Sequence, residues 1–309
     1  MTADLLVPMF VTVIGAATPL LYAALGELVT ERAGVLNLGV EGMMLAGAVA
    51  GFATVVGTGS HTLGILAAAA AGAAMALLFA ILTLTLLANQ VATGLALTIF
   101  GIGLSALAGA RYIGTPIPAL PKLDLPGLSA LPVIGPILFG QDVLVYLSLA
   151  ATAGIAWFLA RTRAGRVLRA CGESDLSAHS IGYHVIRIRY AAVLFGGAMA
   201  GLGGACLSLS VTPMWIEGMT AGRGWIALAL VAFASWRPGR LLAGAYLFGG
   251  VTILQLYLQG SGMLQIPSQV MNMLPYLATV ILLTVIASGA GRQRLDAPAC
   301  LGKPFRPPS

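Results

Sequence analysis

Residues 62–88 read TLGILAAAAAGAAMALLFAILTLTLLA, twenty-seven residues without one charged side chain. About 20 helical residues cross the ~30 Å hydrocarbon core of a bilayer, so this stretch is long enough to span a membrane as a helix. It lacks the alternation of polar and apolar residues that is typical of barrel strands, and its alanines favour helix formation and close packing. The stretch therefore predicts a membrane-spanning α-helix, and it sets how the other apolar runs are interpreted.

The rest of the chain also consists mainly of apolar runs. The runs at 224–236 and 273–288 are too short for an ordinary crossing, so we interpret them as short or broken helices inside a bundle. The sequence predicts an all-α polytopic membrane protein with about eight to ten transmembrane helices in a single domain over residues 1–309. The further apolar runs lie at 5–25, 38–57, 91–110, 142–160, 190–210 and 240–259.

Composition excludes several classes of protein. The chain is 59% hydrophobic and 8% charged, with a mean hydropathy of +0.95, whereas a soluble domain is about 25% charged. An ordinary soluble enzyme and a disordered chain are therefore both excluded. The net charge is +6, but the basic residues lie between apolar runs, as the positive-inside bias produces, so nucleic-acid binding is not predicted. The three cysteines lie far apart, and no metal site is predicted.

The placement of arginine predicts the topology. The loop 161–189 carries six arginines, and the turn at 236–240 and the tail beyond residue 291 are also basic, so all three are expected in the cytoplasm. The proline-rich loop 111–141 is then extracytoplasmic. Counting back places the N-terminus outside, whereas a half-spanning segment at 26–37 would place it inside. Both alternatives remain open at this point.

Polar residues interrupt the apolar pattern at 26–42. Ionisable groups at membrane depth are costly and usually pair or face a water-filled route. We interpret this stretch as a broken helix that lines a translocation path, with Glu27, Asn37 and Glu41 as candidates. The alternative is a plain cytoplasmic loop with a surface pair between Glu31 and Arg32, and with Glu41 bonded to a neighbouring helix.

The centre of the arginine-rich loop predicts two short helices. The first, at about 164–171, is expected to end at Gly172, a glycine being common just after a helix. The second is expected to begin after Ser174, which can cap its N-terminus, and to end near Gly182. A short capped helix on a loop suits docking into a groove of another protein, and resting on anionic lipid headgroups is the alternative.

The stretch 211–224 is expected on the outer side. Trp215, Glu217 and Arg223 there are candidates for an outer gate or a receptor contact, although Trp215 and Arg223 also fit as membrane-interface anchors. The pairs Gly47/Gly51 and Gly197/Gly201 have the small-xxx-small spacing that is typical of helix packing.

Motifs of catalysis are missing from the sequence. Gly302-Lys303 is followed by proline and does not form a phosphate-binding loop, so the chain is not expected to hydrolyse nucleotides. There is no HExxH or GxSxG motif. We predict no catalytic residue, no metal and no cofactor bound by this chain.

Four stretches carry a family likeness. The chain resembles the membrane permeases of bacterial ABC importers, in the branch that includes ribose and branched-chain amino-acid permeases, and most resembles the nucleoside and simple-sugar permeases. The resemblance implies that Asn89 and Gln90 also lie on the translocation path. The stretches are ERAGVLNLGVEG at 31–42, NQVATGLA at 89–96, GRGWIALA at 222–229 and MLPYLAT at 273–279.

The loop GESDLSAHSIGY at 172–183 also resembles that family, which usually has Gly-Glu-Asn-Pro-x-Ala-Ala followed by Gly-Ile. The resemblance implies that this loop docks on a partner ATPase, and its substitutions imply a partner that has diverged. The residues carried over to this coupling role are Arg169, Gly172, Glu173, Ser174, Ala178 and Gly182.

The implied function is that of a multi-pass cell-membrane permease which moves a small uncharged solute by alternating access. The resemblance implies a nucleoside or simple sugar as the solute, with branched-chain amino acids or another small metabolite as alternatives. The implied partners are an ABC ATPase that uses ATP, a second related permease, an extracytoplasmic solute-binding protein and membrane lipid. A less favoured class is an ion-coupled secondary transporter that would use Glu27 and Glu41.

Overall fold

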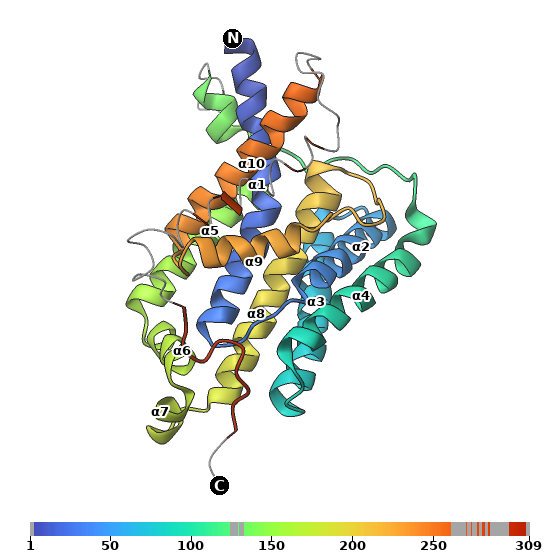
Figure 1. The fold of residues 1–309 in the computed structure, drawn as a ribbon. Coiled ribbons are helices and arrows are strands. Elements are labelled where there is room, and N and C mark those ends of the chain that lie inside the picture. Colours follow the sequence, from blue (N-terminus) through green and yellow to red (C-terminus); the bar gives the residue numbers. More distant parts are fainter. Residues whose placement is uncertain are drawn as a thin grey trace.

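The computed structural model describes residues 3–123, 129, 133–260, 270, 273, 277, 280, 281, 284 and 297–306. Within these residues the chain is a bundle of α-helices and has no β-sheet (Figure 1). The helices are α1 (Ala3–Arg32), α2 (Val40–Thr58), α3 (His61–Ala80), α4 (Gln90–Gly109), α5 (Val143–Arg161), α6 (Arg163–Glu173), α7 (Asp175–Ser180), α8 (Val185–Ala205), α9 (Arg223–Phe233) and α10 (Pro238–Gly260). Short 3₁₀ or π segments lie at Ile81–Thr85, Ala110–Tyr112, Gly135–Phe139 and Cys206–Val211.

Seven helices in the described part of the chain are long and apolar enough to cross a membrane, namely α1, α2, α3, α4, α5, α8 and α10. The polytopic all-α prediction is therefore confirmed. The eleven-residue α9 confirms that the run at 224–236 is a short helix, and its buried residues Ile226, Ala227 and Leu230 place it inside the bundle. The run predicted at 273–288 lies largely outside the described residues.

Side-chain caps explain where several helices begin. Ser60, Asn89, Asp142 and Thr162 each accept a hydrogen bond from a backbone N–H in the first turn of the helix that follows. Such a cap satisfies one of the four free N–H groups at a helix start and stabilises it by about 1 kcal/mol. The start of each of these helices is therefore determined by a residue next to it in the sequence.

Glycine contacts hold α2, α3 and α8 together. A Cβ atom on Gly72 would lie 2.1 Å from the Gly197 carbonyl oxygen, and one on Gly47 would lie 2.4 Å from Gly201 Cα. Only glycine permits backbones to approach this closely. The small-residue pairs therefore serve helix packing, as predicted.

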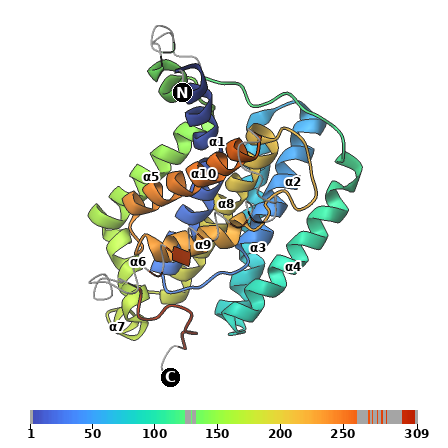
Figure 2. The ribbon, with the colours of Figure 1, turned by 45° about the horizontal axis from the view of Figure 1, so that its top comes forward.

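The chain doubles back twice within the bundle. After α1 ends, residues 33–39 run from its lower end toward the start of α2 (Figure 1). After α8, residues 212–222 return into the bundle, and α9 then crosses in front of α1 and α8 (Figures 1 and 2). Non-helical backbone of this kind is tolerated at membrane depth only where protein or a cavity surrounds it.

The two ends of the bundle carry different segments. Helices α6 and α7 and residues 297–306 lie at one end, and the N-terminus lies at the other, near the segment that follows α4 (Figures 1 and 2). The positive-inside rule assigns the arginine-rich end to the cytoplasm. Helix α1 continues to Arg32 and does not break at residue 26, and the outer position of the N-terminus stays a prediction.

Candidate functional site

Residues 33–39, which we call the break, connect α1 to α2 without helical structure. Polar side chains, most of them from the 26–42 stretch, form hydrogen bonds at this break. Asn37 donates from Nδ2 to Glu27 Oε1 at 3.0 Å, and its Oδ1 accepts a hydrogen bond from the Gly39 amide at 3.0 Å. The Leu36 amide donates to Gln90 Oε1 at 2.8 Å. These contacts supply partners for backbone groups that the break leaves free. The structure therefore places Glu27, Asn37 and Gln90 around the same short segment, and their position on a translocation path stays a prediction.

Two atoms at this place keep unused hydrogen-bonding capacity. Glu27 and Gln90 are buried, with exposed fractions of 0% and 4%. Glu27 Oε2 and Gln90 Nε2 nevertheless have no hydrogen-bond partner. Leaving a buried polar atom unpaired costs about 1–3 kcal/mol. The break therefore holds one free acceptor and one free donor next to segment 33–39.

Glu41 bonds to the start of a neighbouring helix, α9. Its carboxylate accepts hydrogen bonds from the Gly222 amide at 2.8 Å and the Gly224 amide at 2.6 Å, and also from the Thr220 hydroxyl. It thus caps the N-terminus of α9, where a negative charge is favoured by the helix dipole. A Cβ on Gly224 would lie 2.6 Å from the Glu41 backbone nitrogen, so glycine is required there. Glu41 joins two broken helices, which the alternative interpretation had partly anticipated.

Asn89 also serves the backbone. Its side chain is exposed, and Oδ1 accepts a hydrogen bond from the Ala92 amide at 3.0 Å at the start of α4. The structure separates it in this respect from its neighbour Gln90, which points into the break. Within this conformation Asn89 is a helix cap.

Glu31 and Arg32 do not form the surface pair of the alternative interpretation. Glu31 is only 3% exposed, and its carboxylate accepts a hydrogen bond from Trp236 Nε1 at 2.6 Å. Arg32 donates to the Trp236 carbonyl oxygen at 3.1 Å. Both residues therefore attach the turn between α9 and α10 to the inner end of α1.

Helices α6 and α7 form a compact unit, which we call the coupling unit (residues 163–182). Contrary to the prediction, α6 continues through Gly172 to Glu173. A Cβ on Gly172 would lie 2.2 Å from the Arg32 carbonyl oxygen, so this glycine serves contact with the end of α1 rather than helix termination. Ser174 ends α6 and caps α7, as predicted for α7, with its hydroxyl accepting from the Ser177 amide.

Arg189 is the residue that sequence reasoning missed. It lies on α8, is 0% exposed, and donates to Asp175 Oδ2 of α7 at 3.1 Å. It also donates to the Ala33 carbonyl oxygen at 3.1 Å and the Lys303 carbonyl oxygen at 3.3 Å. One guanidinium group therefore connects the coupling unit, the break after α1, and the C-terminal segment.

The C-terminal segment 297–306 completes this inner end. The Cys300 amide donates to the Gly172 carbonyl oxygen at 2.9 Å, and the Gly302 amide donates to that of Gly34 at 3.2 Å. Phe305 packs in a small buried cluster with Cys171, Ala178 and Val185. Burial raises the pKa of the Cys171 thiol, so this cysteine packs as a neutral side chain.

The predicted coupling residues divide into two groups. Arg169, Glu173 and Gly182 are exposed, whereas Gly172 and Ala178 are buried inside the unit and Ser174 is partly buried. The outer face of the unit instead presents two apolar side chains, Leu176 at 56% and Ile181 at 71% exposure. Helical spacing was the available signal, because Leu176 and Ala178 cannot face the same way on one short helix.

The three candidate residues of the stretch 211–224 also differ in exposure. Trp215 is 1% exposed and packs against Gly109, where a Cβ would lie 2.1 Å from its Nε1 atom. Burial removes Trp215 from any receptor contact in this conformation. Glu217 is exposed, whereas Arg223 is half-buried and donates to the Met219 carbonyl oxygen at 2.9 Å. Of the three candidates, Glu217 alone presents its side chain freely to the outer surface.

Known proteins provide a comparison for this geometry. The family described as "Branched-chain amino acid transport system / permease component" matches residues 9–287. The chain is 41% identical to "Putative glucose ABC transporter permease protein TsgC13" of Haloferax volcanii, with 93% of each chain covered. It is 32% identical to the guanosine ABC transporter permease protein NupQ of Bacillus subtilis (94% and 93% covered) and 32% identical to the nucleoside ABC transporter permease protein NupC of Lactococcus lactis (91% and 92%).

These matches cover nearly the whole chain, including the break, α9 and the coupling unit. Permease components of this kind are non-catalytic and work with an ATPase partner, and the seven long apolar helices agree with a multi-pass protein of the cell membrane. The chain belongs to the branched-chain amino acid transport system / permease component family and is a permease subunit of an ABC importer.

Proposed function

We propose that this permease imports a small, uncharged, hydrogen-bonding solute of the nucleoside or simple-sugar class. Relatives that are similar over more than nine tenths of the chain are named for glucose, guanosine and nucleosides. The free acceptor Glu27 Oε2 and the free donor Gln90 Nε2 at the break support a route for molecules that carry both donors and acceptors. Branched-chain amino acids or another small metabolite are the alternative cargo.

The observation that carries the mechanism is the position of Arg189. Its bonds to Asp175 and to the Ala33 carbonyl oxygen tie the coupling unit directly to the end of α1. A push on the exposed face of α7 by an ATPase is therefore passed to the break, where Glu27 and Gln90 lie. ATP is used by the partner, and the chain itself binds no cofactor in this scheme.

The remaining partners follow from alternating access. A bundle that opens to each side in turn needs a second wall, which we assign to a second related permease. An extracytoplasmic solute-binding protein would dock on the outer surface formed by residues 111–123, 133–141 and 211–223, where Glu217 is exposed. Membrane lipid surrounds the apolar outer faces of the spanning helices.

Ion coupling through Glu41 receives no support from the geometry. The Glu41 carboxylate is already occupied by two amides and a hydroxyl at the start of α9. Uptake that persists without the ATPase and stops with an uncoupler would nevertheless decide for a secondary transporter.

The coupling role is tested by Leu176→Asp in the complete transporter reconstituted in proteoliposomes. Leu176 is 56% exposed on α7, so a charge there is expected to disturb docking without disturbing folding. ATPase stimulation by loaded binding protein should fall at least tenfold. The matched control is Leu86→Asp, the same change at a 66% exposed position in the turn after α3, which belongs neither to the coupling unit nor to the proposed receptor surface and should leave stimulation unchanged. Full stimulation in Leu176→Asp would contradict the docking assignment.

The solute class is tested separately on the binding protein. A calorimetric screen of nucleosides, simple sugars and branched-chain amino acids should show binding in one of the first two groups. Binding confined to branched-chain amino acids would overturn the cargo assignment and leave the coupling assignment intact.

A further inference from the structure

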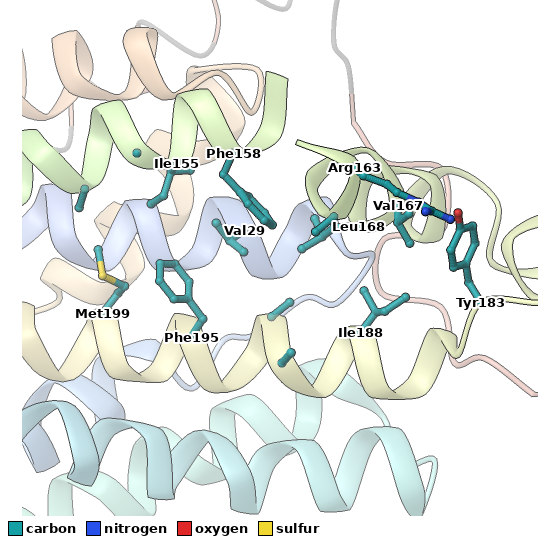
Figure 3. A pocket seen from close by; sticks show the side chains of 15 residues that line it. Val29, Ile155, Phe158, Arg163, Val167, Leu168, Tyr183, Ile188, Phe195 and Met199 are labelled. Atoms are coloured by element: carbon teal, nitrogen blue, oxygen red, sulfur yellow. The ribbon is translucent and has the colours of Figure 1, made fainter. Parts of the chain in front are cut away.

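A groove separates α5 from α8 in the cytoplasmic half of the bundle. It has a volume of about 880 Å³ and lies between α1, α5, α6 and α8 (Figure 3). Its walls are almost entirely apolar, with Ile155 and Phe158 on α5, Phe195 and Met199 on α8, and Val29 on α1. A wall of this composition does not suit a sugar or nucleoside, so the groove is not part of the proposed solute route.

The groove opens to the outside of the bundle. Gly154, Ala191 and Phe195 on its rim are exposed, and a Cβ on Gly154 would meet nothing within 4 Å. From Ile188 to Met199 along α8 the groove spans eleven helical rises, which is about 16 Å at 1.5 Å per residue. Half of a ~30 Å hydrocarbon core is about 15 Å. The groove therefore matches the acyl layer of one leaflet in length.

Polar groups lie at only one end of the groove. Arg163, at the start of α6, and Tyr183 reach toward one another there, at the opposite end from Met199 (Figure 3). Arg163 is exposed and has no hydrogen bond or ion pair in the described part of the chain. The neighbouring exposed side chains Arg161 and Arg166 add to the positive charge at this end. An apolar channel with a cationic mouth is complementary to an amphiphile with an anionic head.

We propose that this groove binds one anionic phospholipid of the cytoplasmic leaflet, with its acyl chain along α5 and α8 and its phosphate at Arg163 and Tyr183. Arginine and a phenolic hydroxyl can both donate hydrogen bonds to phosphate oxygens. Because Ala164, Val167 and Leu168 of α6 also line the groove, the bound lipid contacts the coupling unit as well as the spanning helices.

Native mass spectrometry of the delipidated full-length chain tests this proposal. Phosphatidylglycerol and phosphatidylcholine are titrated in parallel, and the wild type should retain one phosphatidylglycerol at least fivefold more tightly, since one basic group near anionic headgroups changes partition about fivefold. Arg163→Gln should remove this preference. Arg187→Gln, the same change at an exposed arginine that does not line the groove, should keep it.

A second pair of variants separates the groove from general lipid contact. Gly154→Leu fills open space in the groove and should lower retention of both lipids at least fivefold. Gly103→Leu fills open space on α4, away from the groove, and should leave retention unchanged. Equal retention in all four variants would show lipid that merely surrounds the bundle, and would overturn the proposal.

Photo-crosslinking identifies the occupant in membranes that contain the complete transporter. A benzophenone side chain at position 195, on the rim of the groove, should yield a phospholipid adduct that Arg163→Gln weakens. A crosslink from this position to another protein chain would show that a partner subunit fills the groove, and would overturn the proposal.

Discussion

Helix α8 packs tightly against α3 but is separated from α5 by a groove. Toward α3, a Cβ on Gly201 would lie 2.1 Å from the Ala68 carbonyl oxygen, so the two backbones are in contact. Toward α5, the same helix leaves a groove of about 880 Å³, and Gly154 on α5 faces open space. The first interface excludes any additional atom, whereas the second has room for a ligand. Helices α2, α3 and α8 thus form one tightly packed layer, and α5 does not belong to it.

Helix α5 packs against α1 and α10 along one buried face, and α5 and the coupling unit also form hydrogen bonds at the outer and inner ends. At the outer end, the Tyr22 hydroxyl donates to the Leu144 carbonyl oxygen at 2.7 Å, and the Ser210 hydroxyl donates to Asp142. At the inner end, Arg189 holds Asp175. Because the groove separates α5 from α8, we expect α5 and the coupling unit to move together against the packed layer, which is what ATP-driven alternating access requires.

The largest expected effect is at the packed interface. Gly201→Leu places a side chain where the Ala68 backbone already lies, and overpacking costs about 1–3 kcal/mol or more where backbone must shift. We expect little folded protein, measured by membrane yield and by thermal unfolding in detergent. Gly103→Leu, with open space around its Cβ, is the control and should behave as wild type. A normal unfolding temperature for Gly201→Leu would show that the two interfaces do not differ as described.

The next largest effect is expected when the contacts of Arg189 at the inner end, which we call the inner tie, are removed. Arg189→Ala leaves Asp175 and the Ala33 carbonyl oxygen without their partner, and breaking a buried ion pair costs about 3 kcal/mol. The coupling unit should loosen, so ATPase stimulation by loaded binding protein should be lost while the spanning helices still insert. Arg189→Lys keeps the charge but loses the planar fork and should be intermediate. Unchanged stimulation in Arg189→Ala would remove Arg189 from the coupling route.

A smaller effect is expected at the outer tie, the hydrogen bond between Tyr22 and Leu144. Tyr22→Phe deletes the hydroxyl that bonds to the Leu144 carbonyl oxygen, at a cost of about 1 kcal/mol. Thermal unfolding should shift down slightly, and the ratio of transport to ATP hydrolysis should stay the same, because the coupling unit is at the other end. Loss of coupling in Tyr22→Phe would mean that the two ties act together.

The smallest expected effect is that of replacing glycine by alanine. This change should raise the free energy of unfolding on one side of α8 and lower it on the other. Gly154→Ala adds a Cβ that meets nothing and replaces glycine by a better helix former, so a gain of about 0.5–1 kcal/mol is expected. Gly72→Ala makes the same change against the Gly197 carbonyl oxygen and should destabilise. Thermal unfolding of both variants provides the measurement, and shifts of equal sign would contradict the comparison.

The fold was largely predictable because it depends on local properties. Apolar runs as long as 62–88 admit only a spanning helix, and the short run at 224–236 could not be one. The Ser174 cap acts over three residues and was predicted correctly. The extent of α6 was wrong, because Gly172 is explained by contact with Arg32, which lies 140 residues away in sequence.

The site was predictable only in part. Glu27, Asn37 and Gln90 do meet at the break, but the role of Glu41 depends on Gly222 and Gly224, about 180 residues further along the chain. A sequence pattern cannot show which distant amides a carboxylate will meet. The same limit concealed Arg189, because it is one of six arginines in a basic loop. The acidic residues Glu173 and Asp175 in that loop indicated that an arginine could be paired, but not which one.

The attachment of Cys300 and Gly302 to Gly172 and Gly34 also bears on biogenesis. These residues leave the ribosome after every spanning helix described above, so the coupling unit gains these two hydrogen bonds only late in translation. We expect chains that are cut before residue 300 to insert with a coupling unit that is less firmly attached to α1.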